Sequence, residues 1–370
     1  MKAKSLWACA LVVVAAGCSA SDGGAVKIGV AGPLTGGQAK NGEDLLDGAT
    51  MAVEEWNAKG GVLGRRIEIV TRDDQAEPKL APTAAQQLVS ERVVGVIGHF
   101  NSGSTIPASE IYHKAGIVTI TPASTNEAVT DRGYPDVFRV CGRDDRQAPA
   151  AANFIVNTMK AKKVAIFDDR TAYGKGLADN VEKGLQGKVE IVFHEGFAKE
   201  ERNFRPYLSK LKDANVDLWY FGGIYEQAAP MVIQAKQLGI TAPMMSGDGV
   251  HGYDEGFLQV CGKACEGTLT TFPYTSPDFP AKYAARFKGK KPGPYAVFSY
   301  TATQTLLGGI EKAGAADGAK VAAAMHAAEF DTPIGKVRFD AKGDVVEKPE
   351  GNYVVWVVKD GGHVLYDEKK

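Results

Sequence analysis

Apolar residues recur with two different periods along the chain, in short runs typical of strands and in longer stretches with helical spacing. In the first third, four apolar runs predict strands at residues 27–30, 67–71, 93–97 and 118–121. After the first run, apolar positions within residues 45–56 recur three and four residues apart, and Gly60 and Gly61 end that helix. Strands that alternate with helices in this way predict an α/β fold, with a mostly parallel sheet covered by helices on both faces.

The same alternation begins again in the second half of the chain. Further strands are predicted at residues 164–167, 189–193, 218–221, 244–245 and 268–272, with two more flanking the turn at Asp360, Gly361 and Gly362. Helices are predicted at residues 148–159, 175–185, 204–212, 227–238, 279–287 and 295–312.

A mature chain of roughly 350 residues exceeds what one hydrophobic core usually supports, so we expect two doubly wound lobes. The first lobe would comprise residues 26–143 and 273–348, and the second residues 144–272 and 349–370. No low-complexity linker separates them, which indicates several close-set crossings between the lobes.

The first residues have the pattern of an export signal. Lys2 and Lys4 precede an apolar run that is too short to span a bilayer as a helix. The residues before Cys18 resemble the bacterial lipobox, with Ala15 where that motif usually has Leu. The resemblance implies a signal peptide at residues 1–17, a lipid on Cys18 and a tether at residues 18–25. Cleavage of an ordinary signal peptide near Ser19 is the alternative.

Charge and cysteine content narrow the range of partners. The formal net charge is −1 and no long run of either sign occurs, which argues against a nucleic-acid partner. Cys261 and Cys265 are spaced to close a small loop as a disulfide, and Cys141 fits a buried apolar thiol. No second Cys or His pair stands at metal-ligand spacing beside Cys261 and Cys265, so we expect neither a metal nor a cofactor.

Several blocks together suggest a family. In order they are Gly32-Pro-Leu-Thr-Gly36, residues 56–64, Asp73-Asp74, residues 96–105, Thr121-Pro-Ala-Ser-Thr-Asn126, Asp169 with Tyr173-Gly-Lys-Gly176, residues 220–225 and Gly293-Pro-Tyr295. Their order and spacing resemble the periplasmic leucine/isoleucine/valine-binding proteins. The resemblance implies the type I periplasmic binding fold, in which three crossover strands join two lobes around a ligand cleft. It also implies an amino acid ligand and an ABC permease as partners.

In the first lobe, the resemblance assigns the ligand to two loops that follow strands. Ser102 begins a helix whose free amides suit a carboxylate, although capping of the helix would also explain a serine there. By resemblance, the Ala123 carbonyl accepts from the ligand ammonium, and Thr125 offers its amide to the carboxylate and its hydroxyl to the ammonium. Ser124 lies in the same loop, and an N-cap is the alternative role for these residues.

In the second lobe, the resemblance points to Tyr173, Tyr225 and Asp248, which would contact the ligand on closure. Asp248 is expected to pair with the ligand ammonium, where the leucine-type proteins carry a longer Glu. Gly247-Asp248-Gly249 is also a good turn sequence, and both tyrosines would suit packing between the lobes.

Specificity is expected to depend on Asn41, Phe100 and Asn101. Asn41 stands where the family pattern has an aromatic ring over the ligand side chain, and Phe100 keeps an apolar wall. Two amides would be left unsatisfied beside a purely aliphatic ligand if they were buried, so a smaller or more polar ligand is favoured.

Enzymes and ligand-sensing receptors are the two alternative classes of function. An enzyme is not expected, because no nucleophile elbow, phosphate loop or zinc-protease motif occurs and the histidines are scattered. A ligand-sensing receptor subunit of the same fold, binding an amide or small carboxylate, would use the same cleft. We expect a monomer, because the lobes must move freely.

Overall fold

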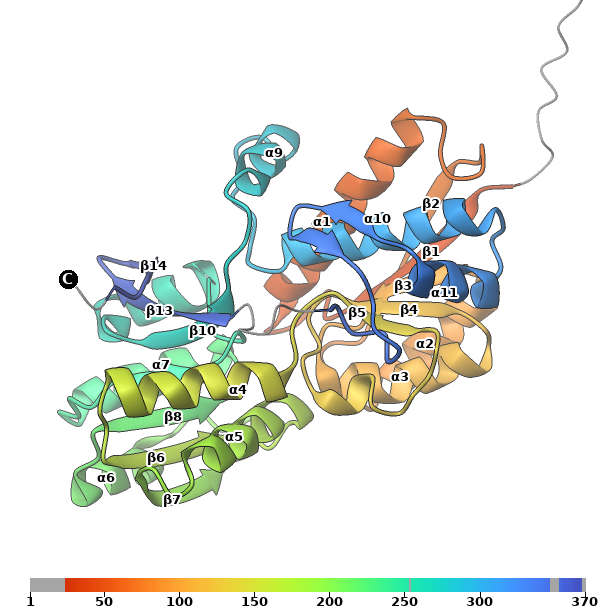
Figure 1. Ribbon diagram of the computed structural model, residues 1–370. Coiled ribbons are helices and arrows are strands. Elements are labelled where there is room, and N and C mark those ends of the chain that lie inside the picture. Colours follow the sequence, from red (N-terminus) through yellow and green to blue (C-terminus); the bar gives the residue numbers. More distant parts are fainter. Residues whose placement is uncertain (1–23, 253, 347–352, 368–370) are drawn as a thin grey trace, which may run out of the picture.

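The computed structural model describes residues 24–252, 254–346 and 353–367, and its strands form two large sheets that lie beside one another (Figure 1). The first sheet is parallel throughout, with the order β2-β1-β3-β4-β5. Its strands are β1 (Val26–Gly32), β2 (Ile67–Asp73), β3 (Gly95–Gly98), β4 (Val118–Thr121) and β5 (Val137–Arg139). The first four were predicted, whereas β5 has only three residues and no alternation to reveal it.

The second sheet has the order β14-β13-β10-β9-β8-β6-β7. Its first five strands in the chain pair in parallel, while β13 is antiparallel to β10 and β14 to β13. They are β6 (Lys163–Asp168), β7 (Glu190–Gly196), β8 (Leu218–Gly222), β9 (Met244–Ser246), β10 (Leu269–Pro273), β13 (Tyr353–Lys359) and β14 (Gly362–Leu365).

Helices cover both faces of the first sheet, with α2 and α3 on one face and α1, α10 and α11 on the other (Figure 1). They are α1 (Ala39–Ala58), α2 (Ala81–Ser90), α3 (Ser102–Lys114), α10 (Ala296–Ala313) and α11 (Gly318–Ala327). Gly48 lets α1 approach α10 closely, because a Cβ there would lie 2.3 Å from the carbonyl oxygen of Ala296.

On the second sheet, α4 and α5 cover one face and α6 and α7 the other. They are α4 (Asp144–Asn153), α5 (Ala172–Leu185), α6 (Arg205–Ala214) and α7 (Tyr225–Gln237), with the short α8 (Gln259–Cys261) and the separate α9 (Phe279–Arg286). The helix expected at residues 148–159 was misplaced: it begins at Asp144 and continues as the π-helical turn η2 (Phe154–Thr158). The first turn of α4 carries two acidic residues and lacks the apolar spacing by which a helix is recognised, so its start was missed. That turn lies between the two sheets (Figure 1).

The chain passes between the two sheets three times, as the family fold implies. It crosses after β5, after β10, and between the small hairpin of β11 (Phe330–Thr332) and β12 (Gly335–Val337) and strand β13. The last passage includes residues 347–352, which lie outside the described ranges, and the exact lobe boundaries stay a prediction.

Separate apolar clusters stabilise the layers. One lies between the first sheet and its helices α2 and α3, and includes Leu88 and Val96; another joins Val164 and Leu177 of the second lobe. Cys261 and Cys265 form a disulfide with Cα atoms 5.5 Å apart, and Cys141 is a free, buried thiol.

The predicted signal peptide and Cys18 lie outside the described residues. Among the helices that are described, none combines the length and the apolar character needed to cross a bilayer.

Candidate ligand-binding site

The carboxyl ends of the parallel strands from both sheets enclose a cavity of about 730 Å³. From the first lobe, Gln38, Asn101 and Ser102 line it in loops that follow β1 and β3. From the second lobe, Asp169 and Tyr173 line it after β6. Ligands of open α/β sheets bind at this edge, and the volume suits a small molecule.

The two lobes are in contact across this cavity. Tyr225 Oη donates to the Gly37 carbonyl oxygen at 3.2 Å, and Asn126 Nδ2 donates to the Ala172 carbonyl oxygen at 2.8 Å. Two ion pairs also cross the gap, Lys40 with Glu255 and Lys199 with Glu77. The structure is therefore that of a closed form, in which both lobes reach the same small volume.

Ser102 is the first residue of α3 and is buried at the edge of the cavity. Its hydroxyl accepts from the Asn126 amide at 3.3 Å. The N-cap of α3 is Asn101, whose side chain makes no capping hydrogen bond. Ser102 therefore does not cap α3. The amide groups of the first turn carry a partial positive charge, which suits an anionic group.

The loop after β4 places its three candidate residues differently. Ser124 Oγ lies 2.9 Å from the Phe100 carbonyl oxygen, and its amide donates to Thr121 Oγ1 at 3.0 Å, so this serine holds the loop in place. Thr125 Oγ1 is buried without a hydrogen-bond partner at bonding distance, and Ala123 is almost fully buried beside it. The N-cap of the following turn η1 (Glu127–Val129) is Asn126 and not Thr125.

Asp248 follows β9 and lies behind Tyr173, away from solvent at 3% exposure. Its Oδ1 accepts from Tyr173 Oη at 2.9 Å, and its Oδ2 accepts from the hydroxyl of Tyr295. Tyr173 Oη also accepts from the Gly249 amide at 2.9 Å. Burial raises the pKa of the Asp248 carboxyl, although the hydroxyls of Tyr295 and Tyr173 oppose that shift.

The turn interpretation of Asp248 also holds, since the His251 amide donates to its carbonyl oxygen at 3.2 Å. The turn fixes the carboxylate against the two tyrosines. Tyr295 is the N-cap residue of α10, which packs on the first lobe, so Asp248 joins groups from both sides. The block Gly293-Pro-Tyr295 carried the family resemblance, but nothing in its pattern indicated contact with Asp248.

Three further buried residues belong to this region and were missed by sequence reasoning. Asp144 and Gln147 lie in the first turn of α4, and Tyr220 lies in β8. Both carboxylate oxygens of Asp144, Gln147 Oε1 and Tyr220 Oη are buried without hydrogen-bond partners. The pair Asp144-Asp145 at the start of a helix was the available signal, and the helix had been expected to begin four residues later.

Two of the expected specificity residues, Asn41 and Asn101, form an amide cluster with Gln38. Sequence reasoning did not identify Gln38 as part of the site. Asn101 Nδ2 donates to Gln38 Oε1 at 2.8 Å and Asn41 Nδ2 donates to the same oxygen at 3.4 Å. Both asparagine Oδ1 atoms are buried without partners. Phe100 instead packs edge-on against Tyr295, with ring centroids 4.9 Å apart.

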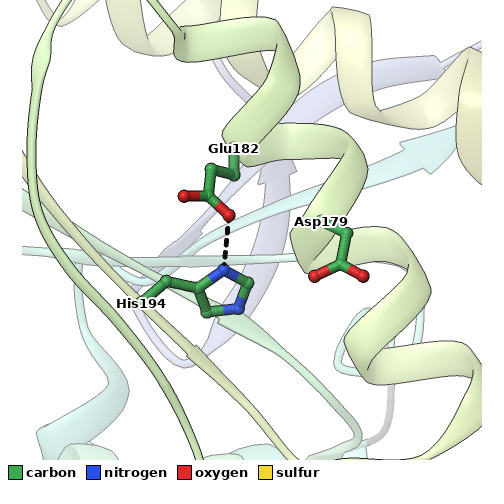
Figure 2. Close-up of side chains that lie close together, drawn as sticks. All are labelled: Asp179, Glu182 and His194. Atoms are coloured by element: carbon green, nitrogen blue, oxygen red, sulfur yellow. Dashed lines mark hydrogen bonds and ion pairs between the residues drawn. The ribbon is translucent and has the colours of Figure 1, made fainter.

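One cluster away from the cavity has a composition that could hold a metal ion. Ligand atoms of Asp179, Glu182 and His194 lie within 4.8 Å of one another, with the two acids on adjacent turns of α5 (Figure 2). His194 Nδ1 lies 2.7 Å from Glu182 Oε2, its Nε2 lies 3.1 Å from Asp168 Oδ2, and hydrogen bonds to both carboxylates raise its pKa. Ion pairing of a protonated histidine explains this arrangement without a metal.

Comparison with known proteins agrees with this geometry. A family model described as periplasmic binding protein matches residues 25–362. An "Amino acid binding protein" of Pseudomonas aeruginosa is 41% identical over 343 residues, covering 91% of each chain. A "Leucine-, isoleucine-, valine-, threonine-, and alanine-binding protein" of the same organism is 39% identical over 326 residues, covering 86% of this chain and 87% of the relative.

A solved structure gives the same fold with a ligand. The branched-chain amino acid transporter substrate binding protein LivJ from Streptococcus pneumoniae, in complex with isoleucine, has a TM-score of 0.84 at 27% identity. The match covers 92% of this chain and 97% of LivJ. A family match that runs from β1 to the start of β14, over two lobes closed on one cavity, makes this chain a member of the periplasmic binding protein family.

Proposed function

We propose that this protein captures a free amino acid between its lobes and delivers it to an ABC importer. The observation that carries the proposal is the buried carboxylate of Asp248, held by Tyr173 of one lobe and Tyr295 beside the other. A buried carboxylate calls for a positive partner, and an amino acid brings an ammonium group. The names of the relatives, which bind amino acids, support the same class of ligand.

The two charged ends of the ligand would bind different groups. The carboxylate would accept from the first turn of α3 and the Ser102 hydroxyl. The ammonium would donate to Asp248, to Thr125 Oγ1, which has no hydrogen-bond partner at bonding distance, and to the Ala123 carbonyl. Groups from both lobes are needed, so the ligand favours the closed form by binding it more tightly than the open form.

The ligand side chain would face the cluster of Gln38, Asn41 and Asn101. Buried amide oxygens without partners disfavour a purely aliphatic surface beside them. We therefore propose a small or polar amino acid in preference to leucine. The name of one relative includes threonine and alanine, which belong to this range, together with leucine, isoleucine and valine.

Export, anchoring and mode of action complete the proposal. A lipid on Cys18 would keep the protein at the membrane surface, where a permease recognises the closed lobes. The protein would act as a monomer and release its ligand unchanged. Conversion of the ligand during incubation, detected by mass spectrometry, would revive an enzymatic role. Co-purification with a chemoreceptor and not with a permease would favour the sensing alternative.

The direct test is isothermal titration calorimetry of the purified protein with the proteinogenic amino acids and with 2-hydroxy acids of the same side chains. We expect amino acids to bind and the 2-hydroxy acids to bind much more weakly. Asp248→Asn should weaken amino acid binding by roughly 2–5 kcal/mol, the usual range for truncating a buried charge pair. Asp213→Asn, an exposed change on α6, is the matched control. Preferential binding of the 2-hydroxy acids would refute the proposal.

A further inference from the structure

Helix α1 holds the start of α10 at close range, and the two helices lie side by side in Figure 1. Gly48 of α1 lets them approach, and Ser299 Oγ of α10 donates to the Leu45 carbonyl oxygen at 2.5 Å. One turn earlier on α1, Asp44 lies so near Gly293 that a Cβ at Gly293 would be 2.2 Å from Asp44 Oδ2. The loop before α10 therefore lies directly against the Asp44 side chain.

Asp44 accepts two main-chain hydrogen bonds from this loop. The Gly293 amide donates to Asp44 Oδ1 at 3.1 Å, and the Tyr295 amide donates to Asp44 Oδ2 at 3.2 Å. The Asp44 side chain is buried, and in the described part of the chain no Lys or Arg forms an ion pair with it. A buried carboxylate without a cation is unfavourable for folding, and such arrangements persist where function requires them.

Tyr295, which Asp44 holds by its main chain, makes a contact between the lobes. The Tyr295 hydroxyl donates to Asp248 Oδ2 on the turn after β9 of the second lobe. The Tyr295 ring packs edge-on against Phe100 and Phe272, with ring centroids 4.9 Å and 5.7 Å away. These rings restrict the direction of the tyrosine side chain, and Asp44 fixes the main chain from which it extends. Together they set where the hydroxyl lies.

The charge of Asp44 responds to pH near neutrality. Burial raises the pKa of Asp44 to about 7, although the amides of Tyr295 and Gly293 oppose that shift. The other titratable groups within range of its charge are Glu43 and Asp47 on α1, which both pair with Lys290, Tyr225 on α7 and Tyr283 on α9. An ionised carboxylate accepts both amides, whereas a protonated one has less acceptor capacity for them.

We propose that Asp44 is a positioning residue for ligand capture, which holds the main chain of Tyr295 so that the Tyr295 hydroxyl meets Asp248 when the lobes close. The proposal rests on the proposed function and adds a residue that acts through another. The ionised carboxylate of Asp44 holds the loop, so closure is favoured above neutral pH. Closure loses this support when Asp44 takes up a proton.

The test is a double-mutant cycle of Asp44→Asn and Tyr295→Phe, with titration calorimetry of the best amino acid ligand. Above neutral pH we expect Asp44→Asn to weaken binding about threefold to tenfold when Tyr295 is present, as for a lost hydrogen bond. In the Tyr295→Phe background it should weaken binding by less than about twofold, because the hydroxyl to be positioned is absent. Glu54→Gln is the control, since Glu54 lies on the same helix, is exposed and pairs with Arg286 of α9.

The pH profile is a readout that a purely structural role would not move. The ratio of wild-type affinity to Asp44→Asn affinity should be largest at about pH 8.5 and fall toward one at about pH 5.5, because a protonated carboxyl is neutral like the amide. Asp144 and Asp248 are present in both proteins, so their titration cancels from the ratio.

Thermal melting of the ligand-free protein separates positioning from stabilisation. Because the folded pKa of Asp44 is raised, the folded protein binds this proton more tightly than the unfolded chain does. The stabilisation is present at low pH and is lost as the pH rises through the folded pKa of about 7. Asp44→Asn should therefore be at least as stable as wild type at about pH 8.5 while it binds the ligand more weakly.

Gly293→Ala tests the same contact with the Asp44 carboxylate intact. The added methyl group would overlap Asp44 Oδ2 and displace the loop, so ligand binding should weaken about threefold or more. This variant decides the question if Asp44→Asn does not fold.

Two results would overturn the proposal. The first is an Asp44→Asn effect that is equal in both backgrounds or absent, or wild-type affinity in Gly293→Ala where the Asn variant does not fold. The second is a lower melting temperature with a loss of affinity that is the same at every pH, which indicates a structural residue. Wild-type protein that binds no amino acid contradicts the proposed function first, so the two failures are distinguishable.

Discussion

Tyr225 Oη lies 3.2 Å from the Gly37 carbonyl oxygen and joins α7 of the second lobe to the loop after β1. Because this contact exists only when the lobes meet, Tyr225→Phe should weaken ligand binding without altering either lobe. The expected loss is about 0.5–1.5 kcal/mol, or roughly twofold to tenfold in affinity, as for one neutral hydrogen bond. Titration calorimetry measures the affinity, and small-angle X-ray scattering reports the fraction of closed protein.

Tyr274→Phe is the matched control for that variant, since Tyr274 is 64% exposed. Wild-type affinity in Tyr225→Phe would mean that the hydroxyl contributes nothing to closure. The other contacts between the lobes, such as the hydrogen bond of Asn126 to Ala172, would then hold the lobes closed.

Ligand preference should respond to the amide cluster. Asn41→Leu removes a buried amide whose Oδ1 has no partner and places an apolar group at the same position. We expect the ratio of leucine affinity to threonine affinity to rise at least about tenfold, through better burial of the aliphatic side chain. Competition binding measures both ligands on one sample. A ratio that does not change would show that Asn41 does not face the ligand side chain.

The sheets could be predicted because each strand carries its own apolar run. All four strands predicted in the first lobe overlap observed strands, and each parallel strand leads into a loop at the same edge. Ser102 and Tyr173, which the family resemblance selected, follow β3 and β6 at this edge and line the cavity. The local pattern of apolar residues is sufficient to place a residue when its position depends only on the strand or helix that it belongs to.

Residues whose role depends on another element were missed. The hydroxyl of Tyr295 donates to Asp248 across the lobes, and Asn101, which precedes α3, donates to Gln38, which precedes α1. Asp144 was missed because α4 begins four residues before the start that its apolar periodicity predicts. Sequence spacing contains no information on such contacts, because they form only when separate elements pack.

Binding should depend on pH through the two buried carboxylates. In the closed form, Asp144 and Asp248 both have a raised pKa, chiefly because of burial. The two carboxylates act on each other, and the other groups around them are Thr125, Glu127, Arg139, Cys141, Gln147, Tyr173, Tyr220 and Tyr295. A bound ammonium favours the ionised carboxylates, so affinity is full above these raised values and falls as the pH drops through them.

Calorimetry in two buffers of different ionisation enthalpy checks this prediction, because protons released on binding change the apparent enthalpy. We expect proton release on binding that grows as the pH falls toward the raised pKa values of the two carboxyls, and a smaller release in Asp144→Asn. Affinity that is constant from about pH 8 to about pH 5, with no proton release, would contradict the presence of protonated carboxylates in the free site.

The stability of the second lobe should depend on His194. Hydrogen bonds to Asp168 and Glu182 raise its pKa above the ordinary value, so the folded protein holds the proton more tightly than the unfolded chain. The stabilisation is fully present below the unfolded pKa of about 6.5 and is lost as the pH rises through the higher folded pKa. His194→Gln should therefore lower the melting temperature more at about pH 5.5 than at about pH 8.5.

Melting in the presence of EDTA removes any contribution from a metal at Asp179, Glu182 and His194, and Glu182→Gln should reduce the pH dependence in part. An equal loss at both pH values would show that packing of the ring, and not its charge, stabilises the lobe.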